Sequence, residues 1–365
     1  MPPTMPMPKP AAKPITVPTA EKTPLTPDVQ LQCLRYSPSG QILAAAGCDG
    51  SIRRWTLTGT ETVELPKLTG HHGWVSGLVF HPDSQRLYSA DSWGRLIAWD
   101  IRQAEAKPLW QVANAHDGWI RQLALSPDGQ SLATVGYDGW LRIWSTAQGA
   151  KVKEFARGNE PIFAVAFHPT GDDLVTGTLH AKVTRWNLAT GKPIGDFPAA
   201  EMYLESRLQD TGGVRTLAFS PTGDQLFIGG SKPSNGGSFQ GIPHILSYDW
   251  KSGKRGPTFQ GTSPNEGLVY DMQVHPQGYV IAVTSGQPGN GRLIFWMPGE
   301  EKPRFVTSQM PNCHSLTLHP AGNRLAVAAT NTGSNGNGKV KGKDGEYPAN
   351  YSPIYFWNLP ERLTS

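Results

Sequence analysis

A short stretch that occurs seven times limits the fold of this chain more than any other feature. Each copy is a segment of alternating apolar residues that runs into a turn, with proline at the second position of the turn. Glycine stands at the fourth position in every copy except one, where Ser84 replaces it. The pattern is typical of a β-strand closed by a tight turn. The copies read LQCLRYSPSG, VSGLVFHPDS, IRQLALSPDG, IFAVAFHPTG, VRTLAFSPTG, VYDMQVHPQG and CHSLTLHPAG, beginning at residues 31, 75, 120, 162, 214, 269 and 313.

The spacing of the copies predicts the size of the repeating unit. Their prolines lie at positions 38, 82, 127, 169, 221, 276 and 320, so successive copies are 42 to 55 residues apart. This period is close to that of a four-stranded propeller blade. An aromatic residue follows each proline, 17 residues later in the first four copies and at other distances in the last three. These aromatic residues are Trp55, Trp99, Trp144, Trp186, Tyr248, Trp296 and Trp357.

The composition indicates strands and turns rather than helices. Hydrophobic residues make up 38 % of the chain and charged residues 17 %, with 41 glycines and 32 prolines among 365 residues. This length would allow two or three domains, but a blade cannot bury its apolar faces without neighbours. We therefore predict an all-β chain that forms a single seven-bladed β-propeller of four-stranded antiparallel blades.

The two ends of the chain predict how the ring closes. Residues 1–17 are rich in proline and have almost no apolar periodicity, so we expect a disordered tail there and the propeller in residues 18–365. Only eight residues follow Trp357, which is too few for a turn and an outer strand. We therefore expect residues 18–26 to supply the outer strand of the last blade and to close the ring.

The third copy shows which family the chain resembles. It reads AHDGWIRQLALSPDGQSLATVGYDGWLRIWS from Ala115, with the Ala-His, Ser-Pro-Asp-Gly, Asp-Gly and Trp-Ser landmarks of a WD repeat in the right order. From about residue 18 to residue 359 the chain resembles the WD-repeat family of β-propellers. The resemblance implies a propeller fold, and it favours a role as a scaffold for other proteins.

The resemblance also implies a buried, hydrogen-bonded set of four side chains in a blade. A histidine precedes the first strand, a hydroxyl lies on the second, an aspartate stands in the following turn, and the tryptophan lies on the third strand. By this alignment only blade 3 has all four, and we assign a structural role to them: His116, Thr134, Asp138 and Trp144. In blade 2, Trp93 stands where the aspartate is expected, so we expect apolar packing to hold most blades.

Four insertions distinguish the later blades from the earlier ones. They cover residues 199–210, 231–243, 285–292 and 331–352, and the first is compatible with a helical turn. Strands alternate in direction within a blade, so the hairpins between second and third strands emerge on the same face as the connections between blades. We therefore expect all four insertions on one face of the ring, although surface loops also lengthen without any function.

Additional aromatic residues in blades 2 and 3 predict a binding surface on this insertion-bearing face. They fall in connections or at strand starts, and Tyr137 precedes the turn aspartate at a position that often contacts partners in the resembled family. The alternative is that the tryptophans pack between neighbouring blades. We predict a partner-binding set of His72, Trp74, Trp93, Asp117, Trp119, Tyr137 and Trp140.

No arrangement of residues in the sequence indicates catalysis. The histidines that open four of the turns would be spread around the opposite face and would not converge on one metal ion. The pair Asp172 and Asp173 and the pair Glu300 and Glu301 fall on predicted turns, and we interpret them as solvated charges. No nucleophile with a matched base can be located by spacing. We therefore expect neither an enzyme, nor a metal site, nor a cofactor.

Three functions remain open at this point. The leading one is a non-enzymatic scaffold that binds a protein or peptide through the insertion-bearing face. A small-molecule binder or enzyme could use the central funnel, but we see no ring of convergent acids or histidines. The aromatic residues together with Lys339, Lys341 and Lys343 would suit single-stranded nucleic acid. A formal net charge of +4 without a dominating basic block makes nucleic acid the weaker choice.

The remaining sequence features concern the compartment. Cys33, Cys48 and Cys313 form neither a disulfide framework nor a metal-spaced pair, and the odd number fits a reducing environment. No segment has the apolar length that spans a bilayer, and the start MPPTMPMPKPAAKP lacks the apolar centre of a signal peptide. We expect a cytoplasmic protein that is a monomer and does not associate with membranes.

Overall fold

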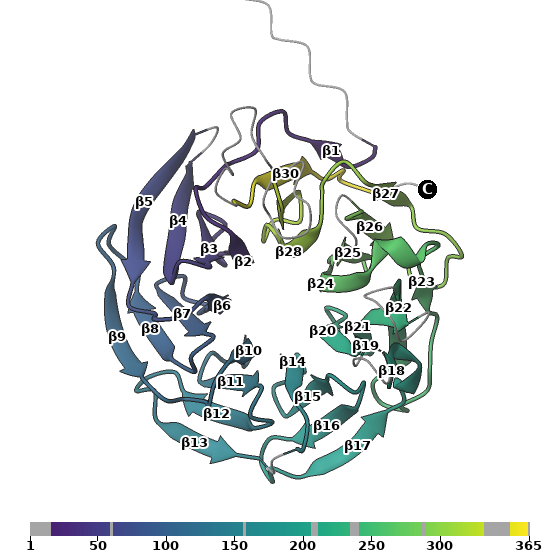
Figure 1. Cartoon of the computed structure of the whole chain (residues 1–365), viewed down its shortest axis with the longest axis horizontal. Helices are drawn as coiled ribbons and strands as arrows, with labels where there is room; N and C mark the ends of the chain where they lie inside the picture. Colours follow the sequence, from purple (N-terminus) through teal and green to yellow (C-terminus); the bar gives the residue numbers. More distant parts are fainter. Residues whose placement is uncertain are drawn as a thin grey trace, which may run out of the picture.

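The computed structural model describes residues 16–58, 61–155, 158–205, 211–233, 241–286, 290–331 and 351–363. Seven four-stranded antiparallel sheets stand side by side as the blades of a closed ring (Figure 1). The predicted fold, a seven-bladed β-propeller, is confirmed.

The chain builds most blades from the centre of the ring outward. Blade 1 consists of β2 (Leu31–Tyr36), β3 (Ile42–Gly47), β4 (Ser51–Thr58) and β5 (Glu61–Thr69). Blade 2 consists of β6 (Val75–Phe80), β7 (Arg86–Asp91), β8 (Leu96–Asp100) and β9 (Lys107–Val112). Blade 3 consists of β10 (Ile120–Leu125), β11 (Ser131–Gly136), β12 (Leu141–Ser145) and β13 (Lys151–Glu154). Blades 4 and 5 consist of β14 (Ile162–Phe167), β15 (Asp173–Thr178), β16 (Val183–Asn187), β17 (Pro193–Phe197); and β20 (Val214–Phe219), β21 (Gln225–Pro233), β22 (Gly241–Asp249), β23 (Phe259–Gln260). Blades 6 and 7 consist of β24 (Leu268–Val274), β25 (Val280–Ser285), β26 (Leu293–Trp296), β27 (Phe305–Thr307); and β28 (Cys313–Leu318), β29 (Arg324–Ala329), β30 (Ile354–Asn358), β1 (Thr19–Ala20).

The second strand of each blade is buried on both faces. In β3 and β7 every residue after the first is buried, because a neighbouring blade covers each side. Successive small or apolar residues, as in ILAAAG, fit this position better than an alternating pattern. The strand tryptophans Trp55, Trp99 and Trp144 are at most 4 % exposed and fill the space between blades. The apolar core is therefore a series of layers between blades rather than one central cluster.

The segment after the N-terminal tail closes the ring, as predicted. Thr19 pairs with Asn358 and Ala20 with Trp357, which makes β1 the outer strand of blade 7. Leu25 exchanges backbone hydrogen bonds with Ile354. Glu21 adds a two-pronged ion pair to Arg324, with distances of 2.7 and 2.8 Å. The first and last parts of the chain are thus held in one sheet. Residues 1–15, which include most of the predicted tail, lie outside the described residues.

The histidines that open four turns connect neighbouring blades. His168 lies 3.1 Å from the carbonyl oxygen of Gly223, and His275 lies 2.8 Å from that of Gly322, each in the turn of the next blade. A Cβ on Gly129 would lie 2.6 Å from the ring of His81, so glycine is required there by its neighbour as well as by its positive φ of 71°. Within the described ranges, no group of three His, Cys, Asp or Glu residues is placed to hold a metal ion.

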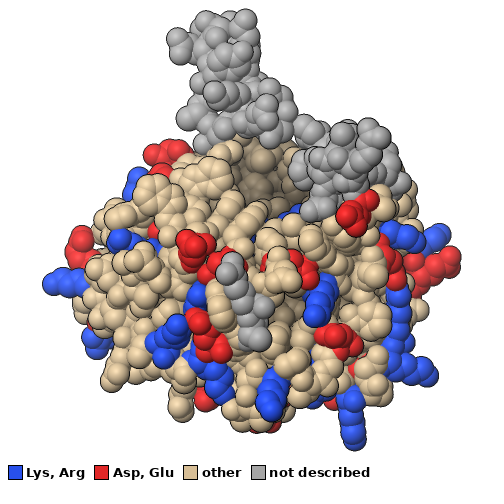
Figure 2. Space-filling view, turned by 60° about the horizontal axis from the view of Figure 1, so that its bottom comes forward, with Lys and Arg blue, Asp and Glu red and all other residues tan. Residues whose placement is uncertain are grey.

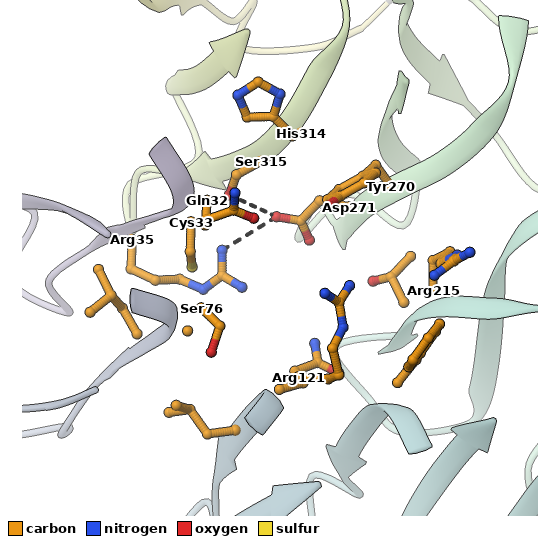
Figure 3. Close-up of a pocket in the computed structure, with 16 residues that line it drawn as sticks. Gln32, Cys33, Arg35, Ser76, Arg121, Arg215, Tyr270, Asp271, His314 and Ser315 are labelled. Carbon is orange, nitrogen blue, oxygen red and sulfur yellow. Dashed lines mark hydrogen bonds and ion pairs between the residues drawn. The ribbon is translucent and has the colours of Figure 1, made fainter. Parts of the chain in front are cut away.

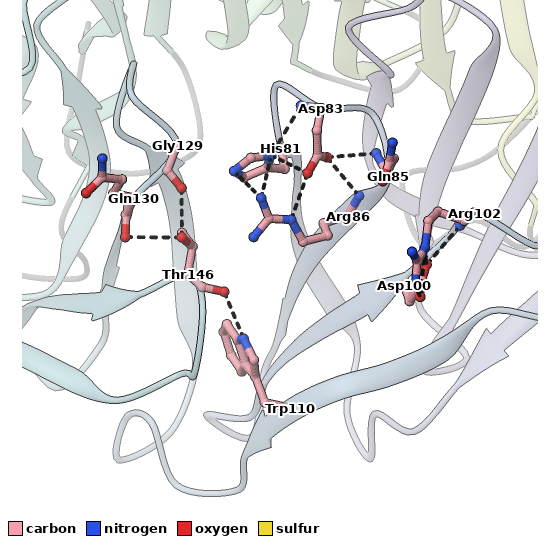
Figure 4. A network of polar contacts seen from close by, with 10 residues as sticks. All are labelled: His81, Asp83, Gln85, Arg86, Asp100, Arg102, Trp110, Gly129, Gln130 and Thr146. Atoms are coloured by element: carbon pink, nitrogen blue, oxygen red, sulfur yellow. Dashed lines mark hydrogen bonds and ion pairs between the residues drawn. The ribbon is translucent and has the colours of Figure 1, made fainter.

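Polar contacts also join blades 2 and 3 on the outer side (Figure 4). The indole N–H of Trp110, on β9, donates to the carbonyl oxygen of Thr146 over 2.9 Å. The Thr146 hydroxyl in turn donates to the carbonyl oxygen of Gly129 over 2.7 Å. In the same view, Arg86 and Asp83 form an ion pair of 2.9 Å inside the turn of blade 2. Thr146 therefore contacts both a turn of its own blade and the outer strand of the preceding blade.

In blade 3 the four side chains predicted to be structural form one chain of hydrogen bonds. The indole N–H of Trp144 donates to the Thr134 hydroxyl over 2.8 Å, and this hydroxyl bonds Nε2 of His116 over 2.7 Å. Nδ1 of His116 bonds the Asp138 carboxylate over 2.8 Å, and Arg142 donates to its second oxygen over 2.7 Å. Burial alone would raise the pKa of Asp138, but the bonds from His116 and Arg142 hold that pKa well below its usual value.

Blade 2 contains the same chain of bonds, so the prediction that it lacks its aspartate is wrong. Trp99 donates to Ser89 over 2.8 Å, and His71 bonds Ser89 over 2.6 Å. His71 then bonds Asp91 over 2.9 Å. The carboxylate therefore comes from Asp91, the last residue of β7, and not from the position of Trp93.

The end of the second strand explains the difference. Asp91 occupies the place that Gly47 takes in blade 1 and Gly136 takes in blade 3, each as the last residue of its strand. A Cβ on Gly47 would lie 2.4 Å from the carboxylate of Asp49, two residues further on. One carboxylate fits in this space. In blade 2 it comes from the last strand residue itself, and in blade 1 it comes from the turn, where Gly47 leaves room for it.

The interpretation of Asp173 as a solvated charge is also wrong. Asp173 is the first residue of β15 and only 7 % exposed, and it forms an ion pair of 2.5 Å with Arg185 of β16. Its neighbour Asp172 is exposed, as expected. Glu300 forms an ion pair of 2.6 Å with Arg304, which also departs from a free surface charge.

The insertion after blade 4 contains the helical turn considered above. A 3-10 helix, η1 (Ala200–Met202), leads into a small hairpin of β18 (Tyr203–Leu204) and β19 (Thr211–Gly212). A second 3-10 turn, η2 (Pro264–Glu266), precedes β24. In the part of the chain that the structure describes, no helix has the length and apolar character needed to cross a membrane.

Candidate functional site

Four aromatic side chains from three neighbouring blades form a continuous line, which we call the aromatic row. Trp74 and Trp119 precede the inner strands β6 and β10, Tyr137 follows β11, and Phe163 lies in β14. The ring centroids are 5.8 Å apart for Trp74 and Trp119, and 5.7 Å apart for Trp119 and Tyr137. Tyr137 and Phe163 follow at 5.5 Å. The structure thus brings together three of the predicted partner-binding residues.

The aromatic row has both exposed and buried members. Trp74 is 49 % exposed and Tyr137 is 47 % exposed, whereas Phe163 is only 5 % exposed. Trp119 lies between these extremes, and its indole N–H is buried without a hydrogen-bond partner among the described residues. Edge-to-face and stacked contacts at these distances stabilise the row itself. The exposed rings remain available to a further surface.

The other predicted partner-binding residues lie apart from the row. His72 and Trp93 form an edge-to-face pair with centroids 6.1 Å apart, and Trp93 is 66 % exposed. Asp117 is exposed and borders, with Trp93, a groove between blades 2 and 3. Trp140 is half-buried beneath the guanidinium of Arg142, which lies 5.3 Å from its ring centroid. The predicted set therefore divides into the row, a neighbouring pair and one packed tryptophan.

Parts of the predicted insertion-bearing face lie outside the described residues. These parts are 206–210, 234–240, 287–289 and 332–350, and they include Lys339, Lys341 and Lys343. Over the described surface in Figure 2, acidic and basic side chains are mixed around the outer wall of the ring. The face around the central hollow at the top of this view shows mostly uncharged atoms.

The central channel has a feature that the sequence analysis missed. The pairing of first and second strands shifts by one residue near the start of the inner strand in all seven blades. Such a bulge leaves one residue unpaired and re-aims its side chain. The seven bulge residues all line one cavity of about 70 Å³ in the channel (Figure 3). They are Gln32, Ser76, Arg121, Phe163, Arg215, Tyr270 and His314.

The charged side chains in this cavity differ in how they are compensated. Arg35 forms an ion pair of 3.3 Å with Asp271, whose carboxylate also accepts hydrogen bonds from Ser315 (Figure 3). Arg121 and Arg215 have no ion pair among the described residues, and the Nε of each is buried without a partner. A simple signal could have identified these residues, because they occupy the same position in every copy of the repeat.

The aromatic row and the cavity meet at Phe163. The guanidinium carbon of Arg121 lies 4.9 Å from the centroid of this ring, and that of Arg215 lies 4.7 Å from it. Arg121 also lies 4.7 Å from the ring centroid of Trp119. The electron-rich faces of the rings therefore hold both cations at the mouth of the channel.

Comparison with known proteins agrees with this architecture. The family model described as WD domain, G-beta repeat matches residues 26–56, 63–100 and 107–145, which belong to blades 1 to 3. The periodic tryptophan protein 2 homolog of Schizosaccharomyces pombe is 24 % identical over 325 residues, which are 83 % of this chain and 31 % of that protein.

Two shorter matches point to the same kind of protein. Actin-interacting protein 1 of Drosophila melanogaster is 27 % identical over 44 % of this chain and 26 % of its own length. The human telomerase Cajal body protein 1 is 31 % identical over 22 % of this chain and 15 % of its own length. The chain thus spans less than a third of each of these relatives. Seven four-stranded blades, three of which match the WD repeat, make this chain a member of the WD-repeat family of β-propellers.

Proposed function

We propose that this propeller is a non-enzymatic platform that binds a protein or peptide through the face that carries the aromatic row. The observation that carries the proposal is the row itself, in which Trp74 and Tyr137 each expose nearly half of their surface on adjacent blades. Interface energy concentrates in large aromatic side chains that lose water on binding. We place this platform in the cytoplasm, as expected from the sequence.

Packing between blades is the competing explanation for the aromatic residues. It suits Trp140, which lies under Arg142, and it suits the inner part of Trp119. It does not account for Trp74 and Tyr137, because stabilisation of the fold alone would favour burial of their rings. We therefore centre the proposed surface on these two residues and include Trp119 as their support.

The proposal is tested by comparing what the immobilised full chain retains with what its variants retain. Trp74→Ala and Tyr137→Ala should weaken the principal partner by about 2 kcal/mol, or roughly 30-fold in Kd, without a change in melting temperature. Trp119→Ala should also weaken binding, with some loss of stability because it is partly buried.

The matched control is Asp172→Ala. Asp172 is exposed in the turn between β14 and β15, at the end of the blade opposite to Trp119 and Tyr137. If Trp74→Ala and Tyr137→Ala retain the same partners as this control, with equal affinity, the proposed surface is wrong.

A further inference from the structure

Two positive charges at the mouth of the channel have no counterion among the residues that the structure describes. Arg121 and Arg215 are bulge residues of blades 3 and 5, and both guanidinium groups lie over the ring of Phe163 in blade 4. Figure 3 shows both side chains at the edge of the cavity, which they reach from different blades. Because neither has an ion pair within the described ranges, their mutual repulsion is offset only by the aromatic rings and by solvent.

The one acid among the described residues that line the cavity is already occupied. The Asp271 carboxylate faces Arg35 at 3.3 Å and accepts hydrogen bonds from the Ser315 hydroxyl at 3.0 Å and from the backbone N–H of Leu316 at 3.1 Å. A carboxylate with these three donors has little capacity for another cation. Asp271 therefore balances Arg35 and leaves the other two arginines uncompensated.

Most of the hydrogen-bonding capacity of the two guanidinium groups is also unused within the described residues. Arg215 donates one bond, from Nη2 to the carbonyl oxygen of Gly212 at 3.3 Å. The Nε–H groups of Arg121 and Arg215 are buried and have no partner in the described structure. Buried donors without partners are costly, so a site of this kind is typical of groups that meet a ligand.

The protonation of Arg215 agrees with this geometry. Burial, together with the charge of Arg121, lowers the pKa of Arg215 to about 10. The guanidinium therefore stays charged at neutral pH. An anion between the two arginines would offset the repulsion between their charges, which contributes to the lowered pKa of Arg215. His314, on the same ring of bulge residues, contributes no positive charge at neutral pH, because burial lowers its pKa to about 4.

We infer that the mouth of the channel binds an oxyanion, a carboxylate or a phosphoryl group, between Arg121 and Arg215. The guanidinium fork matches the geometry of both groups and binds them through two parallel hydrogen bonds. The cavity of about 70 Å³ is several times the volume that a single water molecule needs. A group of a few heavy atoms therefore fits.

The aromatic row indicates where the oxyanion comes from. Phe163 ends the row and also lies beneath both arginines, so a segment that docks on Trp74 and Tyr137 can extend an acidic side chain to the channel. This inference deepens the proposed function, since the oxyanion is assigned to the partner. Oxyanion binding itself can be tested without that partner.

The experiment is a calorimetric titration of the full chain at low ionic strength. Four probes are compared: inorganic phosphate and three blocked tripeptides, Ac-Gly-X-Gly-amide, in which X is phosphoserine, glutamate or glutamine. We expect the phosphoserine and glutamate peptides to bind and the glutamine peptide not to bind. Arg121→Gln and Arg215→Gln should each weaken this binding at least tenfold, and Arg215→Lys should retain more of it because the charge remains.

Arg102→Gln is the matched control. Arg102 has a 61 % exposed side chain and pairs with Asp100 on the outer side of blade 2, so its loss should leave binding unchanged. The melting temperature provides a second measure of binding. It should rise more with phosphate than with chloride of equal ionic strength, and Arg121→Gln should abolish this difference.

Several outcomes would overturn the inference. Equal binding of the glutamine and glutamate peptides would exclude recognition of an oxyanion, as would binding that both arginine variants retain. If free phosphate binds but neither acidic peptide does, the site takes a small anion and the assignment of the oxyanion to a partner protein is wrong. If partner capture fails in Trp74→Ala but the titration gives no anion binding, the proposed function stands and this inference fails.

Discussion

Replacement of Asp91 by alanine tests the corrected assignment of the hydrogen-bonded set in blade 2. Asp91 is completely buried. Its carboxylate bonds Nδ1 of His71 at 2.9 Å and accepts from the backbone N–H groups of Trp93 and Arg95, both at 2.9 Å. The residue therefore connects the segment between blades 1 and 2 to the turn within blade 2.

The expected cost follows from the donors that lose their acceptor. The Nδ1–H of His71 is buried, and each buried donor without a partner costs about 1–3 kcal/mol. The N–H of Trp93 lies nearer the surface, where water replaces the lost bond. We expect Asp91→Ala to reduce the free energy of unfolding by about 2–4 kcal/mol, and Asp138→Ala in blade 3 by a similar amount.

Two controls make the test specific. Trp93→Ala changes the position at which the repeat pattern places the aspartate, but this side chain is 66 % exposed. Asp172→Ala removes an exposed carboxylate. Both should stay within about 0.5 kcal/mol of the unchanged protein.

The assay is urea unfolding followed by tryptophan fluorescence, with midpoints compared at equal slopes. In a double-mutant cycle, His71→Ala and Asp91→Ala should be coupled by at least about 1 kcal/mol. Coincident midpoints for Asp91→Ala and Trp93→Ala would show that the carboxylate does not stabilise the blade. Additive effects of the His71 and Asp91 changes would show that the bond between them does not.

Two further predictions concern ring closure and pH. Deletion of residues 1–14 should leave the melting temperature nearly unchanged. Deletion of residues 1–27 removes β1 and the Glu21–Arg324 ion pair, so it should lower the melting temperature and cause aggregation. Equal melting temperature and solubility of the two truncations would contradict ring closure by β1. Burial lowers the pKa of His314 from 6.5 to about 4, so between these pH values the unfolded chain binds a proton that the folded chain does not. The free energy of unfolding should therefore fall as the pH decreases through this window. His314→Gln should reduce the slope of this free energy against pH, measured by urea unfolding at pH 7, 5.5 and 4.5, by up to about 1.4 kcal/mol per pH unit. An unchanged slope would show that His314 is protonated in the folded state.

The architecture could be predicted from sequence because it depends on repeated local patterns. The Pro-x-Gly turn and the strand tryptophan recur in phase, and each blade needs the same strands. Ring closure followed from a count of residues after Trp357, and β1 indeed pairs with β30. These inferences required only that every copy fold alike.

The errors concern positions where neighbouring blades differ. Asp91 was missed because a carboxylate from the strand end replaces one from the turn, and residue spacing cannot show that both reach the same histidine. The position of Asp173 after a turn predicts a solvated charge, but its partner Arg185 comes from the next strand of the blade. Both are contacts that depend on the direction of a side chain, which is not encoded in the repeat.

The channel could not be predicted because a bulge changes the period of the inner strands. Strict alternation would place the second, fourth and sixth residues of each copy on one side of the strand. In β2 and β6 the second and fifth residues are the partly exposed ones, because the bulge inserts a residue between the first and third. The residues at the mouth of the channel are therefore identified correctly only when the seven copies are compared at one position.

At this bulge position Arg121 and Arg215 stand on either side of Phe163, and a carboxylate is absent from all seven copies. A ring that needed these arginines only for its own stability would gain from an acid in one of the other copies, so the excess of positive charge points to a ligand from outside the blades.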